Sequence, residues 1–116
     1  MKIKFYKYNS QDAEIVTFHL KSHGIKCDII GGIRDKGHSN KDIDLYFPEL
    51  DGEEKSVILL AELLGCSTKV ITPAFVRTDV GGIYFYSKIF GEIDCFFKKH
   101  TKEYCENFWK ENPDAN

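Results

Sequence analysis

The chain has 116 residues, of which 42% are hydrophobic and 29% charged, and its formal net charge is −2. We therefore predict one globular domain over residues 1–116, with a tail that frays from about residue 112. The small net charge excludes a whole-molecule attraction to nucleic acid. The 4 widely spaced cysteines form no CxxC pair, which disfavours a zinc knuckle and indicates a reduced, cytoplasmic protein. Because no apolar run is long enough, we expect neither a membrane span nor a signal peptide.

The N-terminal third predicts a strand followed by a helix. Alternating apolar and polar residues over Lys2–Tyr8 favour a short strand. Asn9 or Ser10 would then cap a helix that ends at Gly24. The apolar residues expected on its buried face are Ala13, Val16 and Leu20.

The middle of the chain predicts two strands joined by a polar connection. Ile25–Ile30 would form the first strand, which leads into a glycine turn at Gly31-Gly32. Asp42–Phe47 would form the second strand, and Pro48 would end it because proline cannot donate to the ladder.

The C-terminal half predicts a helix, a strand, an antiparallel hairpin and a final helix. These elements are expected over Gly52–Leu64, over Lys69–Thr72 with an extension through Ala74–Arg77, over Ile83–Ser87 with Ile93–Phe97, and from Thr101 onward. A turn is expected at Asp79–Gly82, and another at Phe90–Glu92 inside the hairpin.

The acidic strand is the most informative segment for function. Side chains alternate along a strand, so Asp42 and Asp44 would point to one face and Ile43 and Leu45 to the other. Two neighbouring carboxylates repel each other unless a hard cation lies between them, and Mg²⁺ bridging to substrate phosphates is the usual case. The alternative is an edge strand whose acidic face is solvated.

A third carboxylate lies in the second strand of the hairpin. Asp94 is surrounded in sequence by apolar residues, and a buried carboxylate needs a partner or a cation. If its strand lies beside the acidic strand, Asp94 would join Asp42 and Asp44 as a ligand or act as a general base. An exposed hairpin position or a salt bridge is the alternative.

Several polar residues near the glycine pair have two interpretations each. Gly31 and Gly32 would let the backbone approach a phosphate closely, or would simply form a turn. Residues that would either bind phosphate or lie in a solvated or capped loop are Arg34, Lys36, His38, Ser39 and Lys41. Arg77 and Lys88 have no predicted position relative to this site. His19 and His23 have i, i+4 spacing, but without a third ligand we predict surface histidines.

These motifs resemble the signature of the polymerase-beta-like nucleotidyltransferase superfamily. The resemblance rests on Gly31-Gly32, the connection, Asp42-Ile43-Asp44 and Asp94, and covers the chain from the first helix to Phe97. The run from Gly31 to Asp35 and the Lys41-to-Leu45 segment are particularly similar to the nucleotide-binding head of CCA-adding tRNA nucleotidyltransferases. The Arg34-Asp35 pair comes one position earlier after the glycines than in that family.

The resemblance implies an α/β (α+β) fold with a mixed β-sheet flanked by helices. It also implies nucleotidyl transfer from an NTP, with two Mg²⁺ ions held by Asp42, Asp44 and Asp94, and with nucleotide contacts from Gly31, Gly32, Arg34, Ser39 and Lys41. The short chain leaves no room for the acceptor-holding domains of larger relatives. We therefore expect a hydroxyl of a protein, a small molecule or RNA as the acceptor, with RNA the least favoured of the three, and we expect a separate helical partner protein. The alternative is an inactive nucleotide-sensing or partner-binding module of the same fold.

Overall fold

The computed structural model describes residues 6–66 and 83–98 and contains both helices and strands. In chain order these are β1 (Tyr8–Asn9), α1 (Ser10–Ser22), β2 (Asp28–Ile30), α2 (Gly31–Lys36), β3 (His38–Ser39), β4 (Ile43–Phe47), α3 (Glu54–Leu63), β5 (Ile83–Ser87) and β6 (Gly91–Phe97). The predicted α+β class with a mixed sheet is confirmed.

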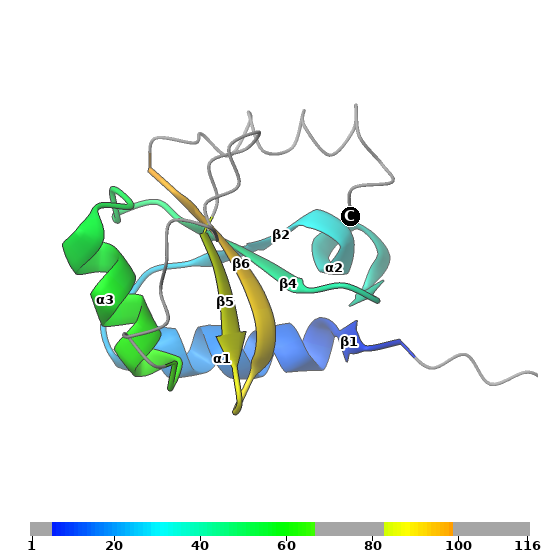
Figure 1. Cartoon of the computed structure of the whole chain (residues 1–116). Coiled ribbons are helices and arrows are strands. Elements are labelled where there is room, and N and C mark those ends of the chain that lie inside the picture. The colour runs from blue at the N-terminus through cyan, green and yellow to red at the C-terminus, as the bar shows by residue number, and fades with distance from the viewer. Residues whose placement is uncertain (1–5, 67–82, 99–116) are drawn as a thin grey trace, which may run out of the picture.

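The main sheet has four strands in the order β2-β4-β6-β5 (Figure 1). β4 and β6 are parallel, whereas β2 pairs antiparallel with β4 and β5 pairs antiparallel with β6. β1 and β3 form a separate two-stranded antiparallel sheet. The acidic strand β4 is therefore interior, so the alternative of an exposed edge strand is wrong.

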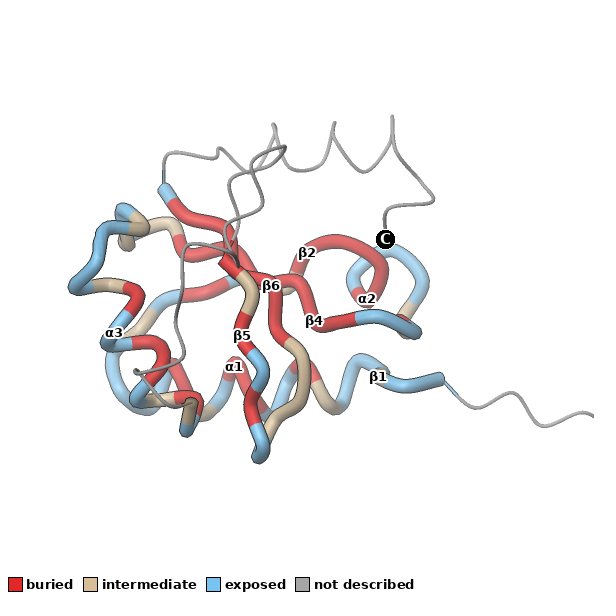
Figure 2. The backbone as a smooth tube through the Cα atoms, viewed as in Figure 1, coloured by how far each residue is buried: buried red, intermediate tan, exposed pale blue. Residues whose placement is uncertain are grey.

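One face of the main sheet packs against α1 and α3, which lie on the same side of it in Figure 1. The two central strands are buried along most of their length (Figure 2). Their apolar side chains alternate onto the helix-covered face, as strand geometry requires. The core residues are Ile43, Leu45 and Phe47 from β4, Ile93, Cys95 and Phe97 from β6, Ala13, Val16 and Leu20 from α1, and Val57, Leu60, Ala61 and Leu64 on or next to α3. The other face of the two strands carries Asp44 and Asp94, together with the buried rings of Tyr46 and Phe96.

Several boundaries differ from the sequence prediction. The predicted glycine turn is the first turn of the short helix α2, and the predicted strand at Asp42 begins one residue later, at Ile43. The hairpin is confirmed, but Gly91 already belongs to β6. The predicted elements over 69–82 and from residue 101 onward lie outside the described residues, as does most of the first predicted strand.

The start of α1 carries a reciprocal cap. Asn9 Oδ1 accepts a hydrogen bond of 3.0 Å from the backbone N–H of Asp12, and Asp12 Oδ2 accepts one of 2.9 Å from the N–H of Asn9. These two bonds satisfy backbone donors that a helix start otherwise leaves without intrahelical partners. Asn9 is thus the cap among the two candidates, Asn9 and Ser10.

Replacement of this cap tests how α1 is stabilised. Asn9→Ala removes the side-chain acceptor, so we expect the free energy of unfolding to fall by about 1 kcal/mol. Urea denaturation followed by circular dichroism measures the change. Gln11→Ala, an exposed position in the same helical turn, is the control and should have little effect. Equal stability of the Asn9 variant and the unchanged protein would contradict the capping role.

Candidate metal centre

Two neighbouring strands bring the three predicted carboxylates together. Asp44 on β4 and Asp94 on β6 are directly paired in the parallel ladder, and Asp42 lies one residue before β4. One carboxylate oxygen from each of the three residues lies within 4.8 Å of the others. The exposed fractions are 6% for Asp42, 1% for Asp44 and 0% for Asp94. The structure therefore confirms the predicted convergence, and the interpretation of Asp94 as an exposed hairpin residue is wrong.

The cluster lies on the sheet face opposite the helix-packed core. The register places Ile30, Asp44, Asp94 and Tyr84 in one row across the four strands, from β2 to β5. Paired residues of adjacent strands share a face, so Tyr84 lies on the far side of Asp94 from Asp44. The two carboxylates occupy the centre of this row, between an apolar and an aromatic neighbour.

The donor set fits a hard divalent cation. Mg²⁺ prefers oxygen ligands at about 2.0–2.1 Å, so two ligands on opposite sides of one ion lie about 4.2 Å apart. The observed limit of 4.8 Å is close to that separation and also permits two ions that share carboxylates. Like-charged carboxylates that face each other across a ladder are destabilising without a counter-charge. Asp42, Asp44 and Asp94 are therefore the residues that would hold a hard divalent cation.

Gly31 makes the close approach to Asp44 possible. Its φ of +71° lies in the left-handed region, and a Cβ at this position would lie 3.0 Å from Asp44 Cγ. Both Gly31 and Gly32 are buried at the start of α2. The backbone conformation and the carboxylate together require glycine at position 31. The sequence had suggested only a turn or a phosphate contact for this residue.

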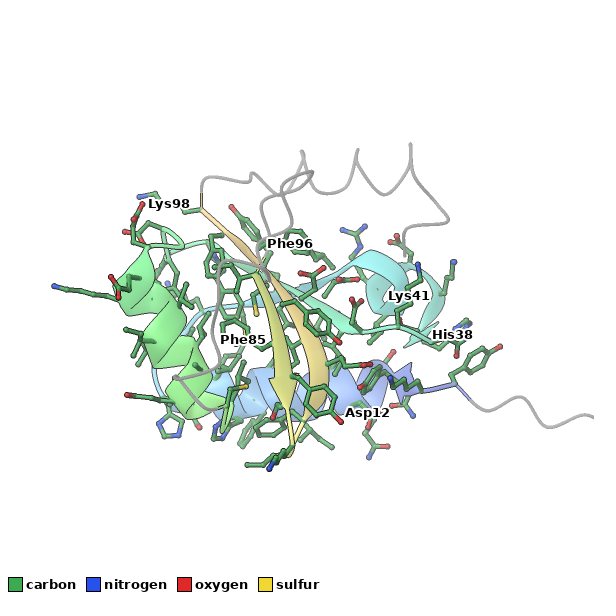
Figure 3. The ribbon with its side chains drawn as sticks, in the orientation of Figure 1. Asp12, His38, Lys41, Phe85, Phe96 and Lys98 are labelled. Carbon is green, nitrogen blue, oxygen red and sulfur yellow. The ribbon has the colours of Figure 1, made fainter. Side chains whose placement is uncertain are left out.

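The remaining predicted site residues lie near the start of β4 or on α2. Ser39 and Lys41 precede β4, and Arg34 lies on α2. The Ser39 hydroxyl is buried and accepts hydrogen bonds from the backbone N–H groups of Lys41 (3.2 Å) and Asp42 (3.3 Å), which is the loop-capping arrangement. Lys41 is exposed and lies at the same end of the molecule as His38 (Figure 3). The exposed Arg34 forms an ion pair with Asp35, with Nη2 2.8 Å from Oδ1.

The histidine pair on α1 does not join a metal group. His19 and His23 are in edge contact with ring centroids 4.9 Å apart. His19 Nε2 also lies 2.6 Å from the carbonyl oxygen of Leu63, so this ring is engaged in packing α1 against α3. Within residues 6–66 and 83–98, the three aspartates are the one group of three or more acidic, histidine or cysteine side chains placed to hold a metal.

Sequence reasoning missed a fourth carboxylate beside the cluster. Glu92 lies two residues before Asp94 and bonds to the side chains of Lys7, Tyr8 and Tyr84. The Lys7 ammonium lowers the pKa of the Glu92 carboxyl, and Glu92 in turn raises the pKa of Lys7. Burial, followed by the charge of Glu92, raises the pKa of Tyr84, which keeps its phenol protonated. The two-residue spacing from Asp94 was the available signal, whereas nothing in the sequence indicated the contact with Tyr8.

Comparison of the chain with protein-family models, curated proteins and solved structures finds no match in any of the three. The described helices include none with the length and apolarity that a membrane span requires.

The contact between Gly31 and Asp44 can be tested with a matched glycine. Gly31→Ala introduces both an unfavourable φ and a clash, so we expect a loss of more than about 1 kcal/mol in the free energy of unfolding. Gly24 has a similar φ of +81° but open space where a Cβ would lie, so Gly24→Ala reports the backbone cost alone. Denaturant titration of both variants gives the difference. Equal losses would show that the carboxylate contact contributes nothing.

Cation binding should stabilise the folded chain. A ligand present at about 100 times its Kd adds about 2.7 kcal/mol of stability. We therefore expect Mg²⁺ or Mn²⁺ to raise the melting temperature relative to EDTA. Asp44→Asn combined with Asp94→Asn should remove that increase. The control is Asp28→Asn, an exposed position on β2 of the same sheet, which should retain it. An undiminished increase in the double variant would exclude this cluster as the binding site.

Proposed function

We propose that this chain is a Mg²⁺-dependent nucleotidyltransferase that transfers a nucleotidyl group from an NTP to a hydroxyl of a protein or small-molecule acceptor. The observation that carries the proposal is the convergence of Asp42, Asp44 and Asp94 on one sheet face. Supporting it is Gly31, whose missing side chain lets the Asp44 carboxylate lie directly against the backbone at the start of α2. The spacing of these residues is also the basis of the resemblance to polymerase-beta-like enzymes. An RNA acceptor is less favoured because the chain carries little net charge, and that charge is negative.

The three carboxylates would have distinct tasks. Asp42 and Asp44 would bind the metal, and Asp94 would be a third ligand or the base that receives the proton of the acceptor hydroxyl. When bound, two Mg²⁺ ions would neutralise phosphate charge and promote deprotonation of that hydroxyl. The acceptor oxygen forms a bond to the α-phosphorus while the bond to the bridging oxygen of the β-phosphate breaks. Pyrophosphate leaves, and the nucleoside monophosphate remains on the acceptor.

The order of strands suggests how the substrates would be arranged. Gly31 and α2 lie on the β2 side of Asp44, and Asp94 lies on the β5 side. The triphosphate would occupy the glycine side, near the exposed cations Lys41 and Arg34, of which Arg34 is paired with Asp35. The acceptor hydroxyl would approach from the side of Asp94. This arrangement separates the leaving group from the nucleophile, as an in-line displacement requires.

Transfer from labelled nucleotides tests the activity. The protein is incubated with each NTP labelled at the α-phosphate, Mg²⁺ and a cell extract, and labelled macromolecules and small molecules are separated. We expect label on an acceptor, together with pyrophosphate release, and we expect Asp42→Ala combined with Asp44→Ala to abolish both. Asp28→Ala is the control and should retain transfer. Equal labelling by the double variant would refute the assigned metal ligands.

A second candidate is an inactive nucleotide-sensing or partner-binding module. It is favoured by the apolar side chains that α1 presents to solvent, since Ile15 is 53% exposed and Phe18 76% exposed. Such a surface suits a separate helical partner. This candidate predicts Mg²⁺-dependent NTP binding, or a stable complex with a protein partner, without pyrophosphate release, so robust release would rule it out. Release of free phosphate without covalent nucleotide would instead indicate a phosphohydrolase.

A further inference from the structure

Asp42 lies just outside the paired region of the main sheet. The parallel ladder between β4 and β6 begins at the pair Ile43 and Ile93, and it fixes Asp44 opposite Asp94. Asp42 precedes the first of these pairs. A cation held by all three carboxylates nevertheless requires Asp42 at a defined distance from Asp94. Contacts outside this ladder also hold the chain just before β4.

Residues 7–10, here called the tether, run antiparallel along residues 37–40. Tyr8 pairs with Ser39, and Asn9 pairs with His38. At the two ends of this pairing, the backbone N–H of Ser10 donates to the carbonyl oxygen of Gly37 (3.1 Å), and that of Lys7 donates to Asn40 Oδ1 (3.4 Å). Residues 7–10 are thus bonded along the whole tether to residues 37–40, which lead into Asp42.

The tether also binds the start of β6. The Tyr8 hydroxyl accepts a hydrogen bond of 2.8 Å from the backbone N–H of Glu92 and donates one of 3.3 Å to its carboxylate. The Lys7 ammonium forms an ion pair with the same carboxylate. The Tyr8 ring packs against Gly91, where a Cβ would lie 2.9 Å from the ring Cζ. One short segment therefore contacts both the loop before β4 and the strand that carries Asp94.

Ser39 transmits this connection to Asp42. Its buried hydroxyl accepts hydrogen bonds from the backbone N–H groups of Lys41 and Asp42, so it holds the turn that delivers the Asp42 side chain to the cluster. Because Ser39 is itself the strand partner of Tyr8, a continuous set of hydrogen bonds joins Asp42 to Glu92, two residues from Asp94. These contacts connect the segments that precede the first pair of the β4–β6 ladder.

We infer that Tyr8 and Ser39 are positioning residues of the metal centre, which fix Asp42 relative to Asp94 through the tether. The inference rests on the metal binding included in the proposed function. It assigns the N-terminal segment a part in cation affinity although none of its side chains belongs to the carboxylate cluster. Outer partners bonded to a ligand residue, as Ser39 is to Asp42, typically change metal affinity by about 10–100-fold when they are removed. Tyr8 acts one step further out, through Ser39 and Glu92.

Mn²⁺, which takes the same oxygen ligands as Mg²⁺, is the probe. Electron paramagnetic resonance of free Mn²⁺ gives its Kd for the full chain, and the spectrum of the bound ion reports the symmetry of its ligands. Tyr8→Phe keeps the ring against Gly91 and removes only the hydroxyl, and Ser39→Ala removes the acceptor for Asp42. We expect each variant to raise the Kd about tenfold and to alter the bound spectrum. Tyr86→Phe, an exposed tyrosine opposite Glu92 on β5, is the control and should leave both unchanged.

The double variant shows whether the Tyr8 and Ser39 hydroxyls affect the Mn²⁺ Kd through the same set of contacts or independently. If both hydroxyls act through the tether, Tyr8→Phe with Ser39→Ala should raise the Kd by about the same factor as either single change. Thermal unfolding in EDTA shows that each variant is folded at the assay temperature. Unchanged Mn²⁺ affinity in both single variants, or fully multiplicative effects in the double variant, would overturn the inference and leave the metal centre in place. Failure of the unsubstituted protein to bind Mn²⁺ would overturn the metal centre and the proposed function together.

Discussion

The parallel pairing of Asp44 with Asp94 is the constraint on which the rest of this structure depends. It places two carboxylates side by side at positions that are almost completely buried. Two such groups repel each other across a ladder, and water cannot screen them well at that depth. Because this repulsion opposes the pairing of β4 with β6, the apolar residues on the opposite face of the two strands must hold them together. A divalent cation bound by both carboxylates would offset this repulsion. The cluster is therefore better explained as a metal centre than as a chance grouping of acidic residues.

One face of the sheet forms the hydrophobic core that stabilises the fold, and the other face carries the carboxylates of the candidate metal centre. α1 and α3 bury the alternate residues of β4 and β6, and this core makes the register of the two strands unique, since a slip by one residue would exchange the faces. The opposite face can then carry costly groups at defined positions. Gly31 shows the same division on a smaller scale, because its missing side chain allows α2 to begin directly against Asp44. The tether adds a third component by connecting the two strands at the end where their pairing stops.

Much of the fold and the site could be predicted from the sequence, for identifiable reasons. The alternation in the acidic strand correctly placed Asp42 and Asp44 on one face. The buried apolar positions of the first helix were correctly predicted because helical periodicity is a local property. The strand at Asp94 was predicted from β-branched and aromatic residues. Two local errors arose where glycine was taken as a turn: Gly31 opens a helix, and Gly91 begins a strand. In each case the glycine lies against a residue distant in the sequence, Asp44 at Gly31 and Tyr8 at Gly91, and local sequence does not reveal such contacts.

By itself, the sequence determined which residue types can bind a hard cation and which face of each strand they occupy, because side-chain alternation follows from backbone geometry alone. Only the tertiary structure decided that β4 and β6 are parallel neighbours and that Asp44 meets Asp94 in register. It alone also revealed that Tyr8 reaches Glu92 across 84 positions of the chain. Such pairings depend on how the helices pack the strands against one another. They are set by the combined burial of many side chains, and no short segment carries that information.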